Sequence, residues 1–486
     1  MNNPKNLLSF PKIRAAFKKF WGYDDFRQPQ GEIIHCLLTQ QDALIVMPTG
    51  GGKSICFQLP ALLQDGLTLV ISPLVALMEN QVQELQQRQL PAGLLHSELP
   101  SNKKTQTLQY LQQNRLKLLY VSPETLLSKT LWERLCQPQI KINGLMLDEA
   151  HCLVQWGDNF RPAYRRLGEV RSHLLKYKPN HQKIPIAAFT ATADPQTQNI
   201  IQDVLQLQQP ERFIISPYRP NLHLKLQTIW TPRGRQKQLI KFIEARNKQT
   251  GLIYVRTRKD SQELANFLAE LGYATAPYHS GLSPGDRREI EKNWLNGNLK
   301  FVICTSAFGI GINKPDVRWV IHYHAPLLLS EYIQEIGRGG RDGKIAEALT
   351  LIAEPTGYLY PEDKQRKKFF LNKLEKQYQT AQQLAKKLPR QGTVEDIAKN
   401  FPEGKIALSL LHSMGQLEWQ GPFEYVIKSS KPHEIITQST AIQAMDKYLK
   451  TRQCRWKFLL QAFGFTDKPT SWYCGHCDNC LSGVKK

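Results

Sequence analysis

Short apolar runs recur along the chain, and each run ends in a turn of small or polar residues. Between residues 42 and 193 they read DALIVMPTG, LTLVISP, LKLLYVSPE, NGLMLDEAH and IPIAAFTAT. Because their apolar positions follow one another without strict alternation, these runs are typical of strands that are buried on both faces. The pattern predicts an α/β fold, with a parallel sheet and connecting helices, over residues 1–215.

The same rhythm returns after about residue 220, in TGLIYVRTR, LKFVICTSAFG, VRWVIHYHAP and EALTLIAE. It predicts a second parallel-sheet lobe over residues 216–360. The two lobes join near SPYRPNLHLK, residues 216–225, where two prolines are expected to interrupt any regular element.

The pattern changes after Pro361. A charged helical stretch, EDKQRKKFFLNKLEKQYQTAQQLAKKL, is followed by GTVEDIAKNF, EGKIALSLLHSMGQLEW and GPFEYVIK. These predict two short helices and a β-hairpin, an order that resembles a winged helix, within a segment 361–440. A small helical insertion that only packs is the alternative. One last helical pattern, AIQAMDKYLKTRQCRWKFLLQAFG, opens a final small module, residues 441–486.

Charge adds a class of partner to this picture. The 486 residues are enough for about three domains. With 64 Lys and Arg against 42 Asp and Glu, the formal charge is +22, which favours a polyanionic partner such as nucleic acid. Residues 361–486 hold 21 of the basic and 12 of the acidic side chains, so this quarter is a candidate nucleic-acid contact.

No part of the sequence predicts export or membrane insertion. The N-terminus lacks a signal-peptide pattern, and no run reaches the roughly 18–20 apolar residues of a membrane span. Five of the nine cysteines stand singly in apolar surroundings, as buried free thiols do: Cys36, Cys56, Cys136, Cys152 and Cys304. We therefore expect a soluble, cytoplasmic protein in a reducing compartment, with no membrane partner.

A glycine-rich turn, MPTGGGKS at residues 47–54, directly follows the predicted strand ALIV. Its glycines, Gly50, Gly51 and Gly52, allow backbone N–H groups to point at a phosphate. Lys53 can reach the β- and γ-phosphates, and Ser54 can bind Mg²⁺. Because the first glycine of the usual pattern is missing, a simple glycine-rich turn is the alternative.

Two carboxylates, Asp148 and Glu149, stand at the end of another predicted strand, in LMLDEAH. Ligands of open parallel sheets bind at the carboxyl edge, so one carboxylate can hold Mg²⁺ while the other polarises the attacking water. An acidic helix cap would account for only one of them. Together with the glycine-rich turn, the pair predicts nucleotide hydrolysis.

The stretch QEIGRGGRDG, residues 334–343, supplies positive charge in the second lobe. Arg338 and Arg341 flank two glycines that permit close approach to a ligand, and arginines can stabilise the charge on a transferred phosphate. Gln334, which opens the stretch, is counted with them among the candidate catalytic residues. A solvated basic loop is the alternative. A nucleotide between the lobes would couple hydrolysis to their closure.

Taken in order, these motifs resemble those of superfamily-two helicases, and more closely those of the RecQ family of DNA helicases. The resemblance covers about residues 20–353 and 441–481, and it implies two RecA-like lobes with ATP as the nucleotide. FWGYDDFRQPQ resembles the adenine-reading motif of the family. This implies that Gln30 reads the adenine edge, with Tyr23 and Arg27 beside the base.

Further stretches resemble the family's DNA and coupling motifs. ISPLVALMENQV and YVSPETL resemble its single-strand contacts, and AFTATAD resembles its coupling motif through Thr190 and Thr192. YVRTRKD, YHSGL and ICTSAFGIGINKPDVR resemble motifs of its second lobe.

HCLVQWGDNFRPAY, immediately after the two carboxylates, resembles the aromatic-rich loop with which RecQ enzymes sense single-stranded DNA. The resemblance gives this role to Trp156, Phe160 and Arg161, which can form a stacking platform. Core packing is the alternative for any one aromatic residue. The departures from the family pattern are Val154, Asp158, Asn159 and, in the arginine stretch, Gly339.

CGHCDNC, residues 474–480, has three cysteines at the spacing of metal ligands. A tetrahedral zinc site needs a fourth ligand, which His476 or Cys454 could supply, although His476 lies between two ligands on a tight turn. CRWKFLLQAFG followed by CGHCDNC resembles the RecQ zinc module, which implies Cys454, Cys474, Cys477 and Cys480 as the ligands. An iron–sulfur cluster on the same ligands is the alternative.

In longer members of the family a winged helix follows the zinc module, and the six residues LSGVKK cannot hold one. The winged-helix-like pattern of this chain lies upstream of the cysteines instead. We therefore expect any contact with duplex DNA to lie in residues 392–428.

The resemblance predicts an ATP-dependent DNA helicase that translocates 3′ to 5′ on single-stranded DNA and unwinds duplex in repair or recombination. Its expected cofactors are ATP, Mg²⁺ and Zn²⁺, and its expected partners are single-stranded and duplex DNA at the nucleoid, with a single-strand-binding protein and repair factors as further candidates. Two alternatives are an RNA helicase or remodelling translocase on the same core, and a nucleic-acid-binding module whose ATPase has decayed. The pattern does not predict an oligomeric state.

Overall fold

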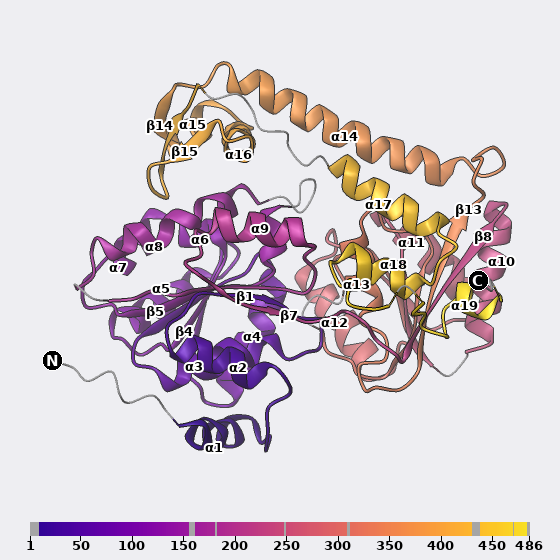
Figure 1. Ribbon diagram of the computed structural model, residues 1–486, viewed down its shortest axis with the longest axis horizontal. Helices are drawn as coiled ribbons and strands as arrows, with labels where there is room; N and C mark the ends of the chain where they lie inside the picture. Colours follow the sequence, from indigo (N-terminus) through magenta and orange to yellow (C-terminus); the bar gives the residue numbers. More distant parts are fainter. Residues whose placement is uncertain are drawn as a thin grey trace. The chain divides into compact units, whose positions relative to one another are not determined.

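The computed structural model describes residues 9–154, 161–179, 182–246, 249–308, 312–429, 438–469 and 471–483 (Figure 1). The chain forms two compact units. The first comprises Met1–Met47, Gly51–Ile215 and Leu374–Ile435, and the second comprises Pro48–Gly50, Ser216–Lys373 and Ile436–Lys486. Each unit therefore combines one lobe of the predicted core with a part of the C-terminal region.

A seven-stranded parallel sheet forms the centre of the first unit, in the order β3-β4-β2-β5-β6-β1-β7. Its strands are β1 (Ala43–Val46), β2 (Leu67–Ile71), β3 (Ala92–Leu95), β4 (Leu118–Val121), β5 (Ile142–Leu147), β6 (Ile186–Thr190) and β7 (Glu211–Ile214). The five predicted apolar runs are β1, β2, β4, β5 and β6, which are buried along their whole length. Burial on both faces explains why they lack alternation.

Helices cover both faces of this sheet, as Figure 1 shows. One layer holds α1 (Phe10–Trp21), α2 (Gln30–Leu38), α3 (Lys53–Leu63) and α4 (Val75–Gln87). The other holds α5 (Ser101–Gln112), α6 (Pro123–Leu126), α7 (Lys129–Leu135), α8 (Gly168–Leu175) and α9 (Pro195–Val204), with the 3₁₀ turns η1 (Ala150–Leu153) and η2 (Pro162–Arg166). Two apolar cores therefore sandwich the strands.

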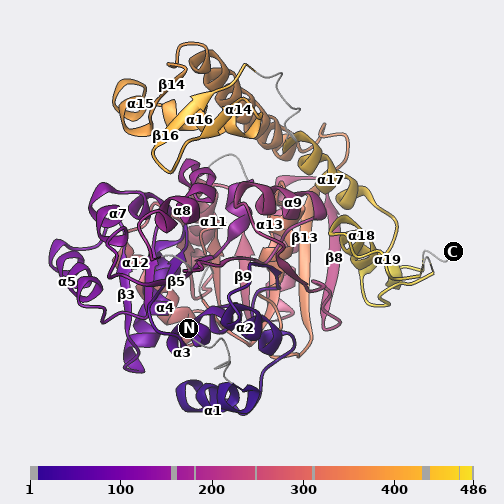
Figure 2. The ribbon, with the colours of Figure 1, turned by 60° about the vertical axis from the view of Figure 1, so that its left-hand side comes forward.

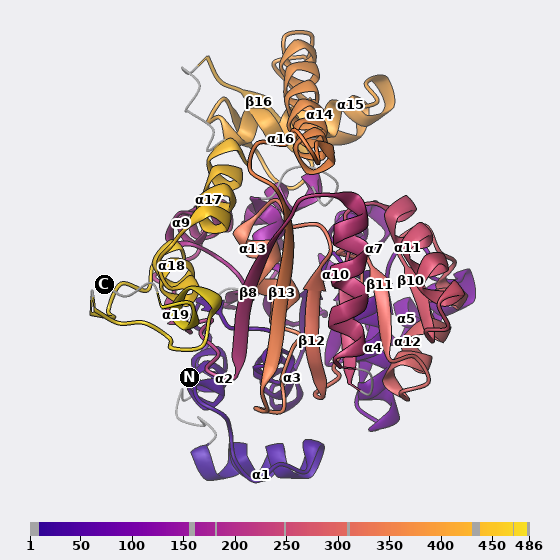
Figure 3. The ribbon, with the colours of Figure 1, turned by 90° about the vertical axis from the view of Figure 1, so that its right-hand side faces the viewer.

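A six-stranded parallel sheet forms the centre of the second unit, in the order β10-β11-β9-β12-β13-β8. Its strands are β8 (Leu222–Ile229), β9 (Thr250–Tyr254), β10 (Thr275–Tyr278), β11 (Phe301–Cys304), β12 (Val317–His322) and β13 (Ala346–Ala353). Figure 3 shows β8, β13 and β12 side by side. Both predicted sheets are thus confirmed as parallel.

The helices of the second unit also lie on both faces of its sheet. They are α10 (Pro232–Glu244), α11 (Arg258–Glu270), α12 (Pro284–Leu295), α13 (Leu329–Ile336), α17 (Gln438–Lys450), α18 (Arg455–Ala462) and α19 (Asp478–Leu481). One core joins α10 and α11 to the sheet, and another joins α13, α17 and α18 to β8 and β13. The C-terminal module is therefore built onto the second lobe.

A small domain belongs to the first unit although it follows the second lobe in the sequence. It holds the end of α14 (Glu362–Ala385), then β14 (Gln391–Thr393), α15 (Val394–Asn400), α16 (Gly404–Ser413), β15 (Leu417–Trp419) and β16 (Glu424–Ile427). Figure 2 shows α15, α16 and the strands gathered at one end of α14. Its three-stranded antiparallel sheet, in the order β14-β16-β15, has the helix–helix–hairpin order predicted from the sequence.

One local prediction was wrong, and another was confirmed. The final helical pattern is two helices, α17 and α18, because the chain leaves the helix after Lys450 and Asn479 Nδ2 donates to the carbonyls of Thr451 and Gln453. The predicted interruption at the prolines of SPYRPNLHLK is confirmed, because residues 216–221 form neither helix nor strand and β8 begins at Leu222. The helix break depends on the contact with the distant Asn479, which a local pattern does not contain.

Candidate functional site

Three neighbouring strands of the first sheet bring the predicted nucleotide residues to one edge. In the order β5-β6-β1, Asp148 directly follows β5, Thr190 ends β6, and the glycine-rich turn follows β1. All three strands are parallel, so these carboxyl ends lie at the same edge. Residues from three separate stretches of the sequence therefore meet where a ligand of such a sheet binds.

The glycine-rich turn ends at the start of α3. Gly52 precedes this helix with φ 81°, in the left-handed region that favours glycine, and Lys53 and Ser54 are its first two residues. The amino end of α3 therefore presents free N–H groups at the turn, which suits a phosphate. Lys53 Nζ lies 3.4 Å from the carbonyl oxygen of Met47, so the ammonium group folds back along the turn.

Gln30 connects the predicted adenine-reading motif to this turn by hydrogen bonds. Its side chain is 3% exposed, and Nε2 donates to the carbonyl of Gly51 at 3.1 Å while Oε1 accepts from the backbone N–H of Arg27 at 3.0 Å. A Cβ on Gly52 would lie 2.2 Å from Nε2, so a larger residue there would displace the Gln30 amide. Tyr23 is 55% exposed and packs on Phe17.

The two predicted carboxylates are buried side by side. Asp148 is 5% exposed, and its Oδ1 accepts from the N–H of Glu149 at 3.0 Å. Burial, and then the charge of Glu149, raise the pKa of Asp148 to about 7, while Lys53 acts in the opposite direction. Because Mg²⁺ prefers carboxylate oxygens and its charge would offset this burial, the residues fit a magnesium site.

His151 joins the carboxylates to the predicted coupling motif. Its Nδ1 lies 3.2 Å from Glu149 Oε2 and 3.0 Å from Thr190 Oγ1. Thr190 Oγ1 in turn accepts from the N–H of Thr192 at 3.3 Å. Burial alone would lower the pKa of His151, but Cys152 and Glu149 outweigh it and raise the pKa. His151 was not among the predicted site residues, although its place beside the two carboxylates in the sequence could have indicated it.

Arg161 brings three of the predicted single-strand segments together. Its Nη2 donates to the carbonyl of Pro73 at 3.3 Å, and its Nη1 lies 3.5 Å from Glu124 Oε1. Pro73 and Glu124 belong to the stretches predicted as single-strand contacts. Trp156 and Phe160, which carry the rest of the predicted loop, lie outside the described residues.

The segment that follows Arg161 returns to the nucleotide site. Tyr164, in η2, is fully buried, and its hydroxyl donates to the carbonyl of Asp148 at 3.1 Å. Only three positions separate Tyr164 from the exposed Arg161. One short segment therefore touches both the predicted DNA contacts and the backbone of the predicted metal ligand. No local pattern predicted the Tyr164 contact.

The predicted arginines of the second unit, Arg338 and Arg341, both lie in the turn that follows α13. Arg338 is 7% exposed, and Arg341 Nη1 donates to the carbonyl of Ile312 at 3.1 Å. Burial, and then the neighbouring charge of Arg338, lower the pKa of Arg341 to about 9. Two neighbouring cations of this kind suit a highly charged anion. Gln334 lies half-buried on α13.

A buried ion pair that the sequence did not indicate supports α13. Arg256 Nη1 and Nη2 donate to the two carboxylate oxygens of Glu335 at 3.1 and 2.7 Å. His322 Nε2 lies 3.0 Å from Glu335 Oε2. Burial alone would raise the pKa of Glu335, but Arg256 and His322 outweigh it and lower the pKa to about 2. The pair joins the ends of β9 and β12 to the helix that carries the arginine stretch.

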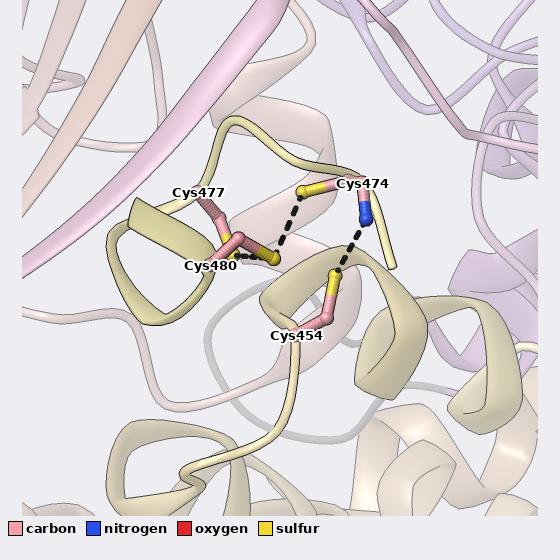
Figure 4. A group of neighbouring side chains, drawn as sticks. All are labelled: Cys454, Cys474, Cys477 and Cys480. Atoms are coloured by element: carbon pink, nitrogen blue, oxygen red, sulfur yellow. Dashed lines mark hydrogen bonds between the residues drawn. The ribbon is translucent and has the colours of Figure 1, made fainter. Parts of the chain in front are cut away.

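Four cysteine sulfurs gather at the C-terminal module (Figure 4). All four lie within 4.8 Å of one another, with 3.8 Å between Cys474 and Cys480 and 3.4 Å between Cys477 and Cys480. Sulfurs around a tetrahedral zinc ion, at bonds of about 2.3 Å, lie about 3.8 Å apart. Backbone N–H groups point at two of the sulfurs, those of Cys454 and Cys477, as they do at thiolates. The donor set therefore fits zinc.

His476, the alternative fourth ligand, is engaged away from the sulfurs. Its Nδ1 lies 2.7 Å from the carbonyl oxygen of Cys474, and its ring packs on Tyr218 and His223 at centroid distances of 6.2 and 4.9 Å. Cys454 comes instead from the break between α17 and α18, where it precedes the first residue of α18.

The cysteine module is tied directly to β8. Trp456 Nε1 donates to the carbonyl of Leu222 at 3.0 Å, and the carboxylate of Asp478 accepts from the N–H of Leu226 at 2.8 Å. Asp478 also forms a buried ion pair with Arg455, next to Cys454. Figure 3 shows α18 and α19 beside β8. The edge strand of the second sheet is thus covered by the module.

The chain matches three family models: the DEAD/DEAH box helicase over residues 27–200, the helicase conserved C-terminal domain over 234–343, and RecQ zinc-binding over 422–481. It is 51% identical to the ATP-dependent DNA helicase RecQ of Synechocystis, over 97% of this chain and 98% of that protein. The chain belongs to the RecQ family of ATP-dependent DNA helicases.

Other members of the RecQ family are longer. The ATP-dependent DNA helicase RecQ of Haemophilus influenzae is 39% identical over 73% of this chain, but the match spans only 55% of that protein. The solved structure of S. cerevisiae Dbp5 bound to RNA and ADP BeF3 covers 72% of this chain and 90% of its own, with a TM-score of 0.59 and 18% identity. That likeness shows the shared two-lobe fold alone. Within the described parts of this RecQ family chain, no helix combines the length and apolarity needed to cross a bilayer.

Proposed function

We propose that this protein couples ATP hydrolysis to 3′ to 5′ translocation on single-stranded DNA and thereby unwinds duplex DNA. The observation that carries the proposal is the segment from Arg161 to Tyr164. Arg161 contacts the two predicted single-strand stretches, and Tyr164 binds the carbonyl of Asp148. A displacement of this segment by DNA would therefore reach the carboxylates directly, which supports DNA-dependent hydrolysis.

The roles of the nucleotide residues follow from their chemistry. Lys53 and the N–H groups of the glycine-rich turn hold the phosphates, Ser54 and Asp148 hold Mg²⁺, and Glu149 orients the attacking water. Mg²⁺, when bound, neutralises charge on the phosphates. Gln30 reads the adenine, with Tyr23 and Arg27 beside it.

The second unit contributes the remaining charge to hydrolysis. Arg338 and Arg341 stabilise the developing charge on the transferred phosphate, with Gln334 beside them. Thr190 and Thr192, through His151, transmit the state of the nucleotide to the strand contacts. The two lobes then bind the DNA strand tightly in turn, and this alternation advances the protein along the strand.

The four cysteines, Cys454, Cys474, Cys477 and Cys480, hold a structural zinc ion. Their sulfur spacing and the N–H groups aimed at them support zinc. Zinc, when bound, cross-links the chain end to α18, and through Trp456 and Asp478 to β8. Its role is therefore to keep the module folded on the second lobe.

The small domain, residues 392–428, contacts duplex DNA. Its helix–helix–hairpin order and the basic character of the C-terminal quarter support this. Deleting residues 392–428 is expected to weaken binding to blunt duplex DNA while binding to single strands is retained. Unaltered duplex affinity would contradict this role. A nucleoid location, and a single-strand-binding protein or repair factors as partners, follow from the family.

The main proposal is tested by ATPase and unwinding assays. Single-stranded DNA is expected to stimulate ATP hydrolysis at least tenfold more than RNA of the same length and base sequence, and duplexes with a 3′ tail are expected to unwind in preference to those with a 5′ tail. Lys53→Ala should abolish both activities, whereas Lys103→Ala, an exposed change on α5, should leave both intact. A preference for RNA would overturn the proposal, and so would a turnover that survives Lys53→Ala.

A further inference from the structure

The small domain packs on the first lobe along a defined seam. Arg166 Nη1 donates to the carbonyl of Pro422 at 3.0 Å, and Ser409 Oγ donates to the carbonyl of Pro162 at 3.4 Å. The 3₁₀ turn η2, which lies between the single-strand arginine and α8, thus forms one wall of the seam. Helix α16 and the strands after it form the other wall.

A cavity of about 340 Å³ lies in this seam. It is lined from the first lobe by η2, α8 and α9, with Arg165 among the lining residues, and from the small domain by His412 and Trp419. Small-molecule sites have volumes of about 300–1,000 Å³, and this cavity lies at the lower end of that range.

Arg165 is a buried cation without a counter-ion. The residue is 6% exposed, and among the described residues its guanidinium makes neither a hydrogen bond nor an ion pair; its Nε is fully enclosed and unpartnered. Burial lowers the pKa of Arg165 to about 10, so the group remains charged at neutral pH. A buried charge that nothing compensates is costly, and an anion in the cavity would remove that cost.

Two further polar atoms of the lining residues lack partners within the described chain. His412 Nδ1 and Trp419 Nε1 are both enclosed and unbonded, and the two rings lie 5.6 Å apart. The indole N–H is a donor only. Three lining residues, from both walls of the seam, therefore each have a polar atom that the described protein leaves unbonded, and a ligand in the cavity reaches these enclosed atoms only when their side chains turn.

The carboxylates at the cavity do not neutralise Arg165. Glu169 accepts from Gln206 Nε2 and from Ser172 Oγ, and it forms no ion pair with Arg165. Asp203, the other acidic lining residue, is exposed. Neither carboxylate therefore neutralises the positive charge of Arg165, and a bound anion could do so.

We propose that this cavity binds a phosphate group through Arg165, and that the side chain of Trp419 turns on binding so that its indole N–H becomes a second donor. A guanidinium presents forked donors that match two oxygens of one phosphate, and the tetrahedral arrangement of oxygens leaves others for a donor on the opposite wall. The phosphate belongs either to the backbone of a DNA strand or to a free phosphate or nucleotide. Either source would fasten the small domain to the first lobe.

The test uses the full-length protein with its nucleotide site filled by a non-hydrolysable ATP analogue and Mg²⁺, so that the glycine-rich turn cannot take up the probe. Inorganic phosphate is then titrated at constant ionic strength, and binding is followed by calorimetry and by the midpoint of thermal unfolding. Saturable binding is expected. Arg165→Gln should weaken it at least tenfold, and Trp419→Phe should weaken it severalfold. Arg212→Gln, an exposed arginine change on β7 in the same unit, should bind as the wild type does.

Absence of saturable binding to the wild type would overturn the proposal, and so would equal binding by Arg165→Gln. Arg165→Gln is expected to fold with an unfolding midpoint in chloride at least equal to that of the wild type, because it removes an uncompensated charge. If it fails to fold, Trp419→Phe decides the matter by the same criterion. An oligothymidylate competition assigns the source: displacement of phosphate by the strand indicates a DNA backbone phosphate, and independent binding indicates a free phosphate ligand.

Discussion

The imidazole Nδ1 of His151 lies 3.0 Å from the hydroxyl of Thr190, at the ends of two adjacent strands of the first sheet. The same nitrogen lies 3.2 Å from a carboxylate oxygen of Glu149. A change of charge or position at Glu149 therefore reaches Thr190 through a single side chain. Because all of these groups are buried, water does not screen the connection.

Removal of the Thr190 hydroxyl should uncouple hydrolysis from strand movement. Thr190→Val keeps the shape of the buried side chain but removes its bond to His151, which is worth about 1 kcal/mol. We expect the number of base pairs unwound per ATP to fall roughly tenfold, a change of about 1.4 kcal/mol, with DNA-stimulated ATPase reduced threefold or less.

Thr68→Val is the matched control, because Thr68 is a buried threonine on β2 of the same sheet whose hydroxyl makes no hydrogen bond within the described chain. Parallel steady-state ATPase and unwinding assays give the number of base pairs unwound per ATP hydrolysed. If Thr190→Val lowered both rates equally, the bond would serve hydrolysis and not coupling.

Gln30→Glu should weaken ATP binding. The substitution replaces the amide donor of Gln30, which is bonded to the carbonyl of Gly51, with a carboxylate that the same carbonyl repels. The glycine-rich turn should then lose its support, and KM for ATP should rise about tenfold, equivalent to about 1.4 kcal/mol. Gln41→Glu, an exposed change just after α2, should keep the wild-type KM. An unchanged KM in Gln30→Glu would show that the amide does not shape the nucleotide site.

Cys454→Ser should remove the metal and loosen the C-terminal module. Zinc measured by atomic absorption is expected to fall from one equivalent to well below half, and protease cleavage within residues 441–483 should become fast, because metal binding and folding are linked. Cys136→Ser, a change of a half-buried cysteine elsewhere, should keep the full equivalent. His476→Ala should also retain it, because His476 Nδ1 is engaged by the carbonyl of Cys474. Loss of zinc from His476→Ala with retention in Cys454→Ser would reverse the ligand assignment.

The stability of the first unit should fall with acidification through His412. Burial, and then the charge of Arg165, lower the pKa of His412 to about 3. Below the ordinary histidine pKa of about 6.5, the unfolded chain takes up a proton that the folded chain refuses, so stability is full above that pH and is lost as the pH falls toward the folded value. Between pH 7 and pH 5 the loss due to this group is about 2 kcal/mol.

Urea unfolding of the wild type and His412→Gln at pH 7 and pH 5 measures this difference. The variant should lose about 2 kcal/mol less than the wild type over that interval. His35→Gln, an exposed histidine change on α2, should retain the wild-type dependence on pH. Equal losses in His412→Gln and the wild type would show that His412 takes up its proton without unfolding.

The local sequence contained much of the nucleotide site. Apolar runs buried on both faces predicted β1, β5 and β6, and the turn chemistry placed Lys53 and Asp148 just beyond their ends. Parallel pairing then brings such residues to one edge whatever the length of the connections. The cysteine spacing likewise predicted three of the four clustered cysteines as metal ligands, because close ligands must share one turn.

Only the tertiary structure decided which distant groups meet. The contacts of Tyr164 with Asp148 and of Arg256 with Glu335 depend on how helices and turns pack across a sheet, and no local pattern contains that packing. The same holds for Cys454, which reaches the other sulfurs only because the helical pattern breaks just before it.

Arg165 is the clearest example of a property that only the tertiary structure decided. In the sequence it is one basic residue among many near a predicted DNA contact. Packing of the small domain buries it beside His412 and Trp419 without a counter-ion. The sequence by itself determined the family, the two sheets and the chemistry at their edges, because those follow from local burial and turns. Whether a charge is exposed or enclosed depends on the segment that covers it, and here that segment lies more than 200 residues further along the chain.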